Sequence, residues 1–116
     1  MPRVRDPQPV LPPAPARSMI DNYVQVMKAL SDPTRLEMVR TIGTHGDYPC
    51  TSLEHALPVG KSTISYHVKV LNQAGLVTVK RQGRRFFYTL HRDVLDFYVP
   101  GLLDRLESER TDAELD

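Results

Sequence analysis

The stretch CTSLEHALPVGKSTISYHVKVLNQAG, residues 50–75, decides the fold class of this chain of 116 residues. It contains two helical patterns separated by Pro58-Val59-Gly60. We expect a short helix to start at a capping box, Thr51-Ser52-Leu53-Glu54, whose side chains would satisfy free backbone N–H groups. We expect Ser62 to cap a longer helix that runs to Ala74. A short helix, a tight turn with glycine and a longer helix form a helix-turn-helix.

The longer helix has one apolar and one polar face. On a helical wheel, Ile64, Val68 and Leu71 form the stripe that we expect to be buried. The opposite face is polar and nearly uncharged, and is formed by Ser62, Thr63, Ser65, Tyr66, Lys69 and Gln73. Hydroxyl and amide groups of this size can reach base edges in the major groove of DNA, although a plain solvated face is the alternative. His67, at the edge of the stripe, either contacts a phosphate or is a half-buried structural histidine.

Charge is distributed unevenly along the chain. Residues 55–92 contain seven lysines and arginines and no carboxylate, whereas residues 1–54 are neutral overall and residues 93–116 carry a net charge of −6. A polyanion is the natural partner of such a stretch, because each basic side chain on a phosphate releases condensed counterions. The alternative is a solvated basic face.

After Gly75 the apolar period changes from that of a helix to two. Residues 76–81 and 85–90 are rich in Val, Phe, Tyr and Thr, and Gln82-Gly83-Arg84 joins them, so we expect a β-hairpin. Basic residues lie at its tip. A basic hairpin that follows a helix-turn-helix is a wing.

Two further helical regions flank this unit. From Ser18, apolar residues recur every three or four positions as far as Leu30, and Ser31 or Asp32 can cap a following helix that has Pro33 in its first turn. A last amphipathic helix is expected over residues 94–106, kinked or briefly broken at Pro100-Gly101.

The expected organisation is a disordered, proline-rich arm over residues 1–17, one folded domain over 18–108 and an acidic tail over 109–116. There is no long apolar run for a membrane span and no secretory signal at the N-terminus. We therefore expect a soluble cytoplasmic protein without a membrane partner.

The chain resembles the ArsR-type (arsenic-repressor-like) winged helix-turn-helix regulators over roughly residues 19–106. Four segments carry the resemblance: ALSDPTRL at 29–36, STISYHVKVL at 62–71, QAGLV at 73–77, and RQGRR at 81–85 with Tyr88. The resemblance implies a mainly α-helical fold with a small β-hairpin, in the order of four helices, two strands and a final helix. It also implies a homodimeric repressor that is paired through its first and last helices and usually released from DNA by an effector.

The first and last helices also carry more apolar surface than a small winged core can cover, which indicates an interface. The expected dimer residues are Tyr23, Met27, Phe97, Tyr98, Leu102 and Leu106. Because a two-fold dimer places its recognition helices about one DNA turn or a multiple of it apart, we expect an inverted-repeat operator.

The metal sites of the family look absent, and we expect no cofactor. Arsenic- and cadmium-sensing members place a Cys-x-Cys pair on the first helix of the helix-turn-helix, but the nearest segment here has only Cys50. Zinc- or nickel-sensing members use Asp-x-His near the start of the last helix, whereas this chain reads His91-Arg92-Asp93. His45, Asp47 and Cys50 leave a weak zinc or nickel site open. Two alternatives remain for Cys50. It is either a redox sensor, whose thiol pKa is lowered by the N-terminus of the following helix, or an idle thiol.

The function expected from the sequence is a homodimeric, sequence-specific DNA-binding repressor of its own or a neighbouring operon, with an unidentified effector or none. An enzyme is not expected, because no catalytic set or phosphate-binding loop is recognisable. The alternative is a winged-helix interaction or architectural module with only non-specific DNA binding. The residues expected to contact DNA are Lys61, Ser62, Thr63, Ser65, Tyr66, His67, Lys69, Gln73, Arg81, Arg84 and Arg85.

Overall fold

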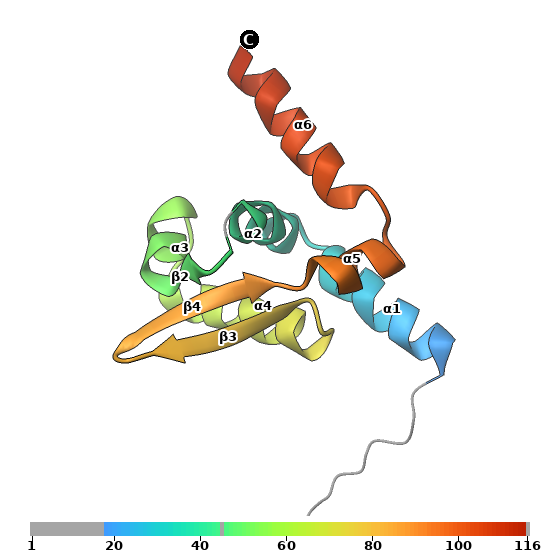
Figure 1. The fold of residues 1–116 in the computed structure, drawn as a ribbon, viewed down its shortest axis with the longest axis horizontal. Helices are drawn as coiled ribbons and strands as arrows, with labels where there is room; N and C mark the ends of the chain where they lie inside the picture. The colour runs from blue at the N-terminus through green and yellow to red at the C-terminus, as the bar shows by residue number, and fades with distance from the viewer. Residues whose placement is uncertain (1–17, 45, 116) are drawn as a thin grey trace, which may run out of the picture.

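A computed structural model describes residues 18–44 and 46–115, the last six of them by backbone alone. It is mainly helical with one small antiparallel sheet, as expected (Figure 1). The elements are α1 (Met19–Leu30), α2 (Pro33–Gly43), β2 (Tyr48–Pro49), α3 (Cys50–Ala56), α4 (Lys61–Gln73), β3 (Val77–Gln82), β4 (Arg85–Leu90), α5 (Arg92–Tyr98) and α6 (Leu102–Leu115). The expected proline-rich arm, residues 1–17, lies outside the described residues.

The core lies where α1, α2, α3 and α4 meet the base of the hairpin. Its largest fully buried side chains come from six different elements and the loop before β3, and include Met38, Ile42, Leu53, Ile64, Leu71, Leu76 and Leu95. Each such side chain contributes about 1.5–3 kcal/mol by leaving water. This shared core fixes the orientation of α4 relative to the hairpin.

The helix-turn-helix forms where expected, but its caps do not. Helix α3 begins at Cys50 after Pro49, and α4 begins at Lys61 after Gly60, and neither start has a side-chain cap. The predicted capping box at Thr51 and the predicted Ser62 cap are therefore wrong. Both residues already lie within the first helical turn, and a capping residue must have non-helical backbone angles.

The hairpin is confirmed, with β3 one residue later than predicted. Val77 pairs with Leu90 and Gln82 with Arg85, and Gly83 adopts a φ of +65° at the tip. The sequence analysis missed β2, whose Tyr48 pairs with Tyr88 to give the strand order β2-β4-β3. Two residues are too few to show an alternating pattern, and Pro49 argues against a strand.

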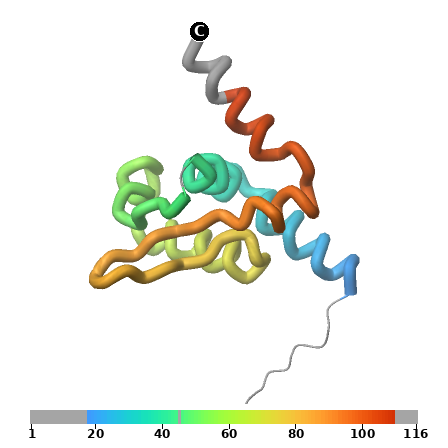
Figure 2. The backbone as a smooth tube through the Cα atoms, viewed as in Figure 1, coloured from blue at the N-terminus to red at the C-terminus, as the bar shows by residue number. Residues whose placement is uncertain are grey.

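The break expected at Pro100-Gly101 divides the last helical region into α5 and α6. Gly101 has a φ of +82°, in the left-handed region that glycine enters without a steric penalty. Helix α6 continues through residues 109–115, the segment expected to be an acidic tail. In Figure 2 the hairpin tip and α3 lie at one end of the molecule, and α1 and α5 lie at the other.

Candidate DNA-binding surface

Helix α4 presents the face that the helical wheel predicts. Ile64, Val68 and Leu71 are buried. The predicted reading residues Ser62, Thr63, Ser65, Tyr66, Lys69 and Gln73 are all exposed, together with Lys61. Tyr66 is the one large residue among them. Its ring is 60% exposed, and such a ring is costly to leave in water. The outward face thus combines one aromatic ring with small hydroxyl and amide groups.

His67 belongs to a part-buried junction and not to that face, because its side chain is only 11% exposed. Its Nδ1 lies 3.0 Å from Nη1 of Arg35. Since an arginine N–H can only donate, Nδ1 accepts and the ring proton lies on Nε2, 4.0 Å from the Asp32 carboxylate. These contacts support the structural alternative for His67 over the phosphate contact.

Arg35 is the centre of this junction. Its Nε donates to the carbonyl of Ala29 at 2.7 Å and its Nη2 to the carbonyl of Lys28 at 3.2 Å, so its guanidinium closes the end of α1. Asp32 caps α2 by accepting from the Arg35 backbone N–H at 3.1 Å. That hydrogen bond is the main cause that lowers the Asp32 pKa. The motif at residues 31–35 thus joins α1, α2 and α4, a role that the sequence analysis did not predict.

Three arginines cluster at the wing. The Arg81 guanidinium lies over the Phe86 ring at 5.8 Å, and Arg85 lies over Phe87 at 5.4 Å. The Arg81 Nε also donates to the Gly83 carbonyl at 2.8 Å. Arg84, in the turn itself, is exposed. These contacts hold two cations in extended positions at the hairpin tip, where they can approach a phosphate or a groove.

The carboxylates nearest to this surface come from outside the basic stretch. Asp47 accepts from Thr89 at 2.7 Å and from Lys80 at 3.3 Å. These two hydrogen bonds lower its pKa, with Thr89 as the larger cause. Glu54 lies 3.8 Å from Lys61. Asp47 is therefore occupied in tying β2 to the hairpin.

The described residues give no support to a weak zinc or nickel site, which the sequence left open. Within residues 18–44 and 46–115, no three His, Cys, Asp or Glu side chains come together in a way that could hold an ion, and His45 lies outside the description. His91 Nε2 contacts the Thr78 hydroxyl. Burial raises the pKa of the Cys50 thiol, which disfavours the redox-sensor alternative, in which the helix N-terminus would lower that pKa.

The predicted dimer residues fall into two groups. Met27 and Phe97 are exposed, and Tyr23 packs edge-on against Tyr98 at 4.7 Å between α1 and α5. By contrast, Leu102 packs against the core of its own subunit, and Leu106 lies beside α2, where its carbonyl accepts from Arg40.

Three exposed apolar residues of α1 were not predicted as part of this surface: Met19, Ile20 and Val24. The helical spacing of Ile20 and Val24 was visible in the sequence as part of one apolar face, whereas Met19 stands outside that pattern. We call the surface formed by Met19, Ile20, Val24, Met27 and Phe97 the α1/α5 patch.

Comparison with known proteins agrees with this geometry. A family model described as a helix-turn-helix domain matches residues 30–80. The uncharacterized HTH-type transcriptional regulator YceK of Bacillus subtilis is 36% identical over 83 residues, which cover 71% of this chain and 83% of that protein. The arsenical resistance operon repressor of Staphylococcus xylosus is 35% identical over 77 residues, covering 66% and 73% respectively.

A solved structure, the ArsR-like transcriptional regulator from Rhodococcus sp. RHA1, superposes with a TM-score of 0.64 at 31% identity. The match covers 83% of this chain and 88% of that one. In the part of the chain that the structure describes, no helix has the length and apolar character of a membrane span. Fold, surface and relatives agree, and the chain belongs to the ArsR family of winged helix-turn-helix, DNA-binding transcriptional regulators, which are not enzymes.

Proposed function

We propose that this regulator is a homodimer that recognises an inverted-repeat operator and represses its own or a neighbouring operon. The observation that carries the proposal is the outward face of α4. It offers hydroxyl and amide groups and an exposed tyrosine ring, and it has no carboxylate of its own. Such groups can bond base edges, while the neighbouring arginines bind phosphates of any sequence.

The dimer is supported by the α1/α5 patch. Phe97 is 63% exposed although its ring packs edge-on against Tyr98, and Met27 is 45% exposed. An apolar patch of this kind marks an interface. Helices α1 and α5, which carry the patch, lie at the end opposite the hairpin tip (Figure 2). Pairing through the patch would therefore leave both recognition helices free for DNA.

The proposal also holds that arsenite and cadmium are not the effectors. Those ions prefer several thiolates held together, and each subunit has one cysteine. Asp47 and Cys50, two of the alternative ligands, are already engaged with the hairpin.

The test is selection of bound fragments from genomic DNA, followed by affinity measurements on the selected operator and on random DNA. Tyr66→Ala should cost about 1–3 kcal/mol on the operator and less on random DNA. Arg84→Ala should weaken both similarly and reduce the dependence of affinity on salt. If no fragment is enriched, or if Tyr66→Ala weakens both DNAs equally, the protein does not read bases through α4 and the architectural alternative stands.

A further inference from the structure

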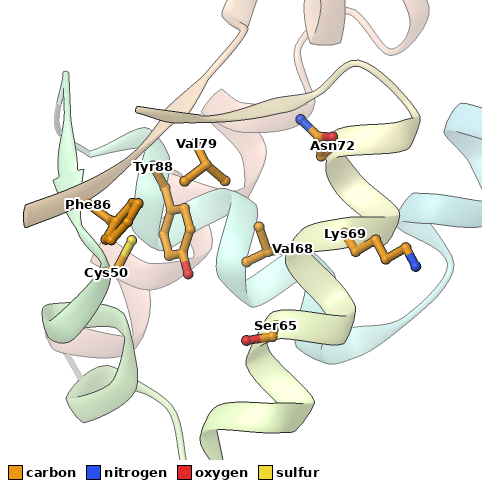
Figure 3. A pocket seen from close by; sticks show the side chains of 8 residues that line it. All are labelled: Cys50, Ser65, Val68, Lys69, Asn72, Val79, Phe86 and Tyr88. Atoms are coloured by element: carbon orange, nitrogen blue, oxygen red, sulfur yellow. The ribbon is translucent and has the colours of Figure 1, made fainter. Parts of the chain in front are cut away.

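A cavity of about 430 Å³ lies between α4 and the inner face of the hairpin (Figure 3). Val68 of α4 forms one wall, Val79, Phe86 and Tyr88 of the hairpin form the other, and Cys50 lies at one end. Its volume is within the range of small-molecule sites, and like them it is mainly apolar.

The cavity explains an otherwise costly exposure. Among the described residues, most of the large exposed apolar side chains belong to the α1/α5 patch, but Val79 and Phe86 do not. They are 44% and 49% exposed and lie on the same hairpin face as the buried Tyr88. The hairpin extends beyond the body of the domain, so its inner face is covered at the base and open toward the tip.

DNA is a poor occupant for this surface. With the helix in a major groove and the wing at a minor groove, the sugar–phosphate backbone passes between them. Apolar walls cannot replace the water lost from a phosphate. An apolar molecule, by contrast, gains free energy from every exposed ring and methyl group that it covers.

The polar groups of the lining narrow the class of ligand. Tyr88 and Cys50 are hydrogen-bonded to each other, and the Asn72 amide donates to the Val77 carbonyl at 2.9 Å. The Lys69 stem lines the cavity, but its ammonium points away from it (Figure 3). The Ser65 hydroxyl has no partner among the described residues and lies on the side of α4 that faces the hairpin, so it is the lining group best placed to meet a ligand.

We propose that this cavity is an effector site for a small, uncharged aromatic molecule with one hydrogen-bonding group, which is held by Ser65 and the hairpin side chains. Ser65 would then serve both the ligand and DNA, so bound ligand weakens operator binding. This last step rests on the proposed function, whereas binding of the ligand does not.

Indole is a suitable probe because the chain has no tryptophan, so indole excited beyond the absorption of tyrosine emits without protein background. The full chain is titrated with indole while the alkylation rate of its single cysteine, Cys50, is followed with iodoacetamide. We expect saturable binding with a parallel fall in the alkylation rate. Absence of saturable binding, or binding that leaves the alkylation rate unchanged, overturns the proposal.

Two substitutions locate the site. Val79→Phe fills the cavity and should abolish indole binding, whereas Gln82→Phe adds the same ring to the opposite face of β3 and should not. Ser65→Ala should weaken indole by about fivefold, the value of one neutral hydrogen bond. Equal binding by the two phenylalanine variants overturns the proposal. If circular dichroism shows that Val79→Phe does not fold, the Ser65→Ala variant decides: an unchanged affinity for indole then overturns the proposal.

Two further arms separate ligand class and mechanism. Indole-3-acetate, an anion, should bind more weakly than indole. If it binds more tightly, and if Lys69→Met loses that binding, the site takes an anion and the proposal of an uncharged ligand is wrong. Lys61→Met, also on α4 but outside the lining, is the matched control. Finally, indole should lower operator affinity of the parent and not of Val79→Phe. If the parent binds no operator at all, the proposed function fails while Cys50 protection still tests the cavity.

Discussion

Replacing Arg35 should show how strongly the interhelical junction holds the recognition helix. Arg35→Met keeps a long apolar stem but removes three hydrogen bonds, to Ala29 at 2.7 Å, to His67 at 3.0 Å and to Lys28 at 3.2 Å. At about 1 kcal/mol each the loss is about 3 kcal/mol, and water can replace the exposed bond to Lys28, which leaves about 2 kcal/mol. For a folded part of this size, that lowers the melting temperature by about 8–16 °C.

The assay is thermal and urea unfolding followed by circular dichroism, at one fixed subunit concentration because dimerisation adds to stability. Arg84→Met is the matched control. It removes the same group from the exposed wing turn and should change stability by less than about 0.5 kcal/mol. Arg35→Lys should resemble Arg35→Met, since an ammonium cannot reach three acceptors in the directions that the planar guanidinium does. The reasoning is refuted if Arg35→Met is no less stable than Arg84→Met.

Three further predictions concern the dimer, acid stability and metals. Phe97→Glu should convert the dimer into a folded monomer by placing a charge in the α1/α5 patch, and light scattering that still shows a dimer would exclude this patch as the interface. Because the Asp32 pKa is lowered on folding, its contribution is present above the ordinary value of 3.8 and lost as pH falls through the lowered pKa. Asp32→Asn keeps an N-cap and should therefore unfold in urea with a shallower dependence on acid pH, and an unchanged dependence would show that Asp32 does not contribute. Stoichiometric arsenite or cadmium should leave the operator complex intact in a gel shift, and release of the parent but not of Cys50→Ser would contradict this.

The sequence by itself determined the helices, the hairpin and the face of α4 that turns outward. These features depend on local sequence: Ile64, Val68 and Leu71 recur on one side of a helix, and residues 85–90 are rich in the aromatic and β-branched residues that strands favour. The carboxylate-free basic stretch is likewise a property of the linear chain. For this reason the family resemblance and the list of exposed residues on α4 were available before any coordinates.

Tertiary structure decided the roles that depend on partners far apart in the chain. His67 shows no sign in the sequence of bonding to Arg35, 32 residues earlier, and β2 exists only because β4 supplies its hydrogen bonds. The wheel showed only that His67 lies at the edge of the buried stripe. Which group faces it depends on how α2 crosses α4. The cavity behind the wing has the same origin, because two local patterns, each correctly predicted, enclose a space only when the core sets the distance between them.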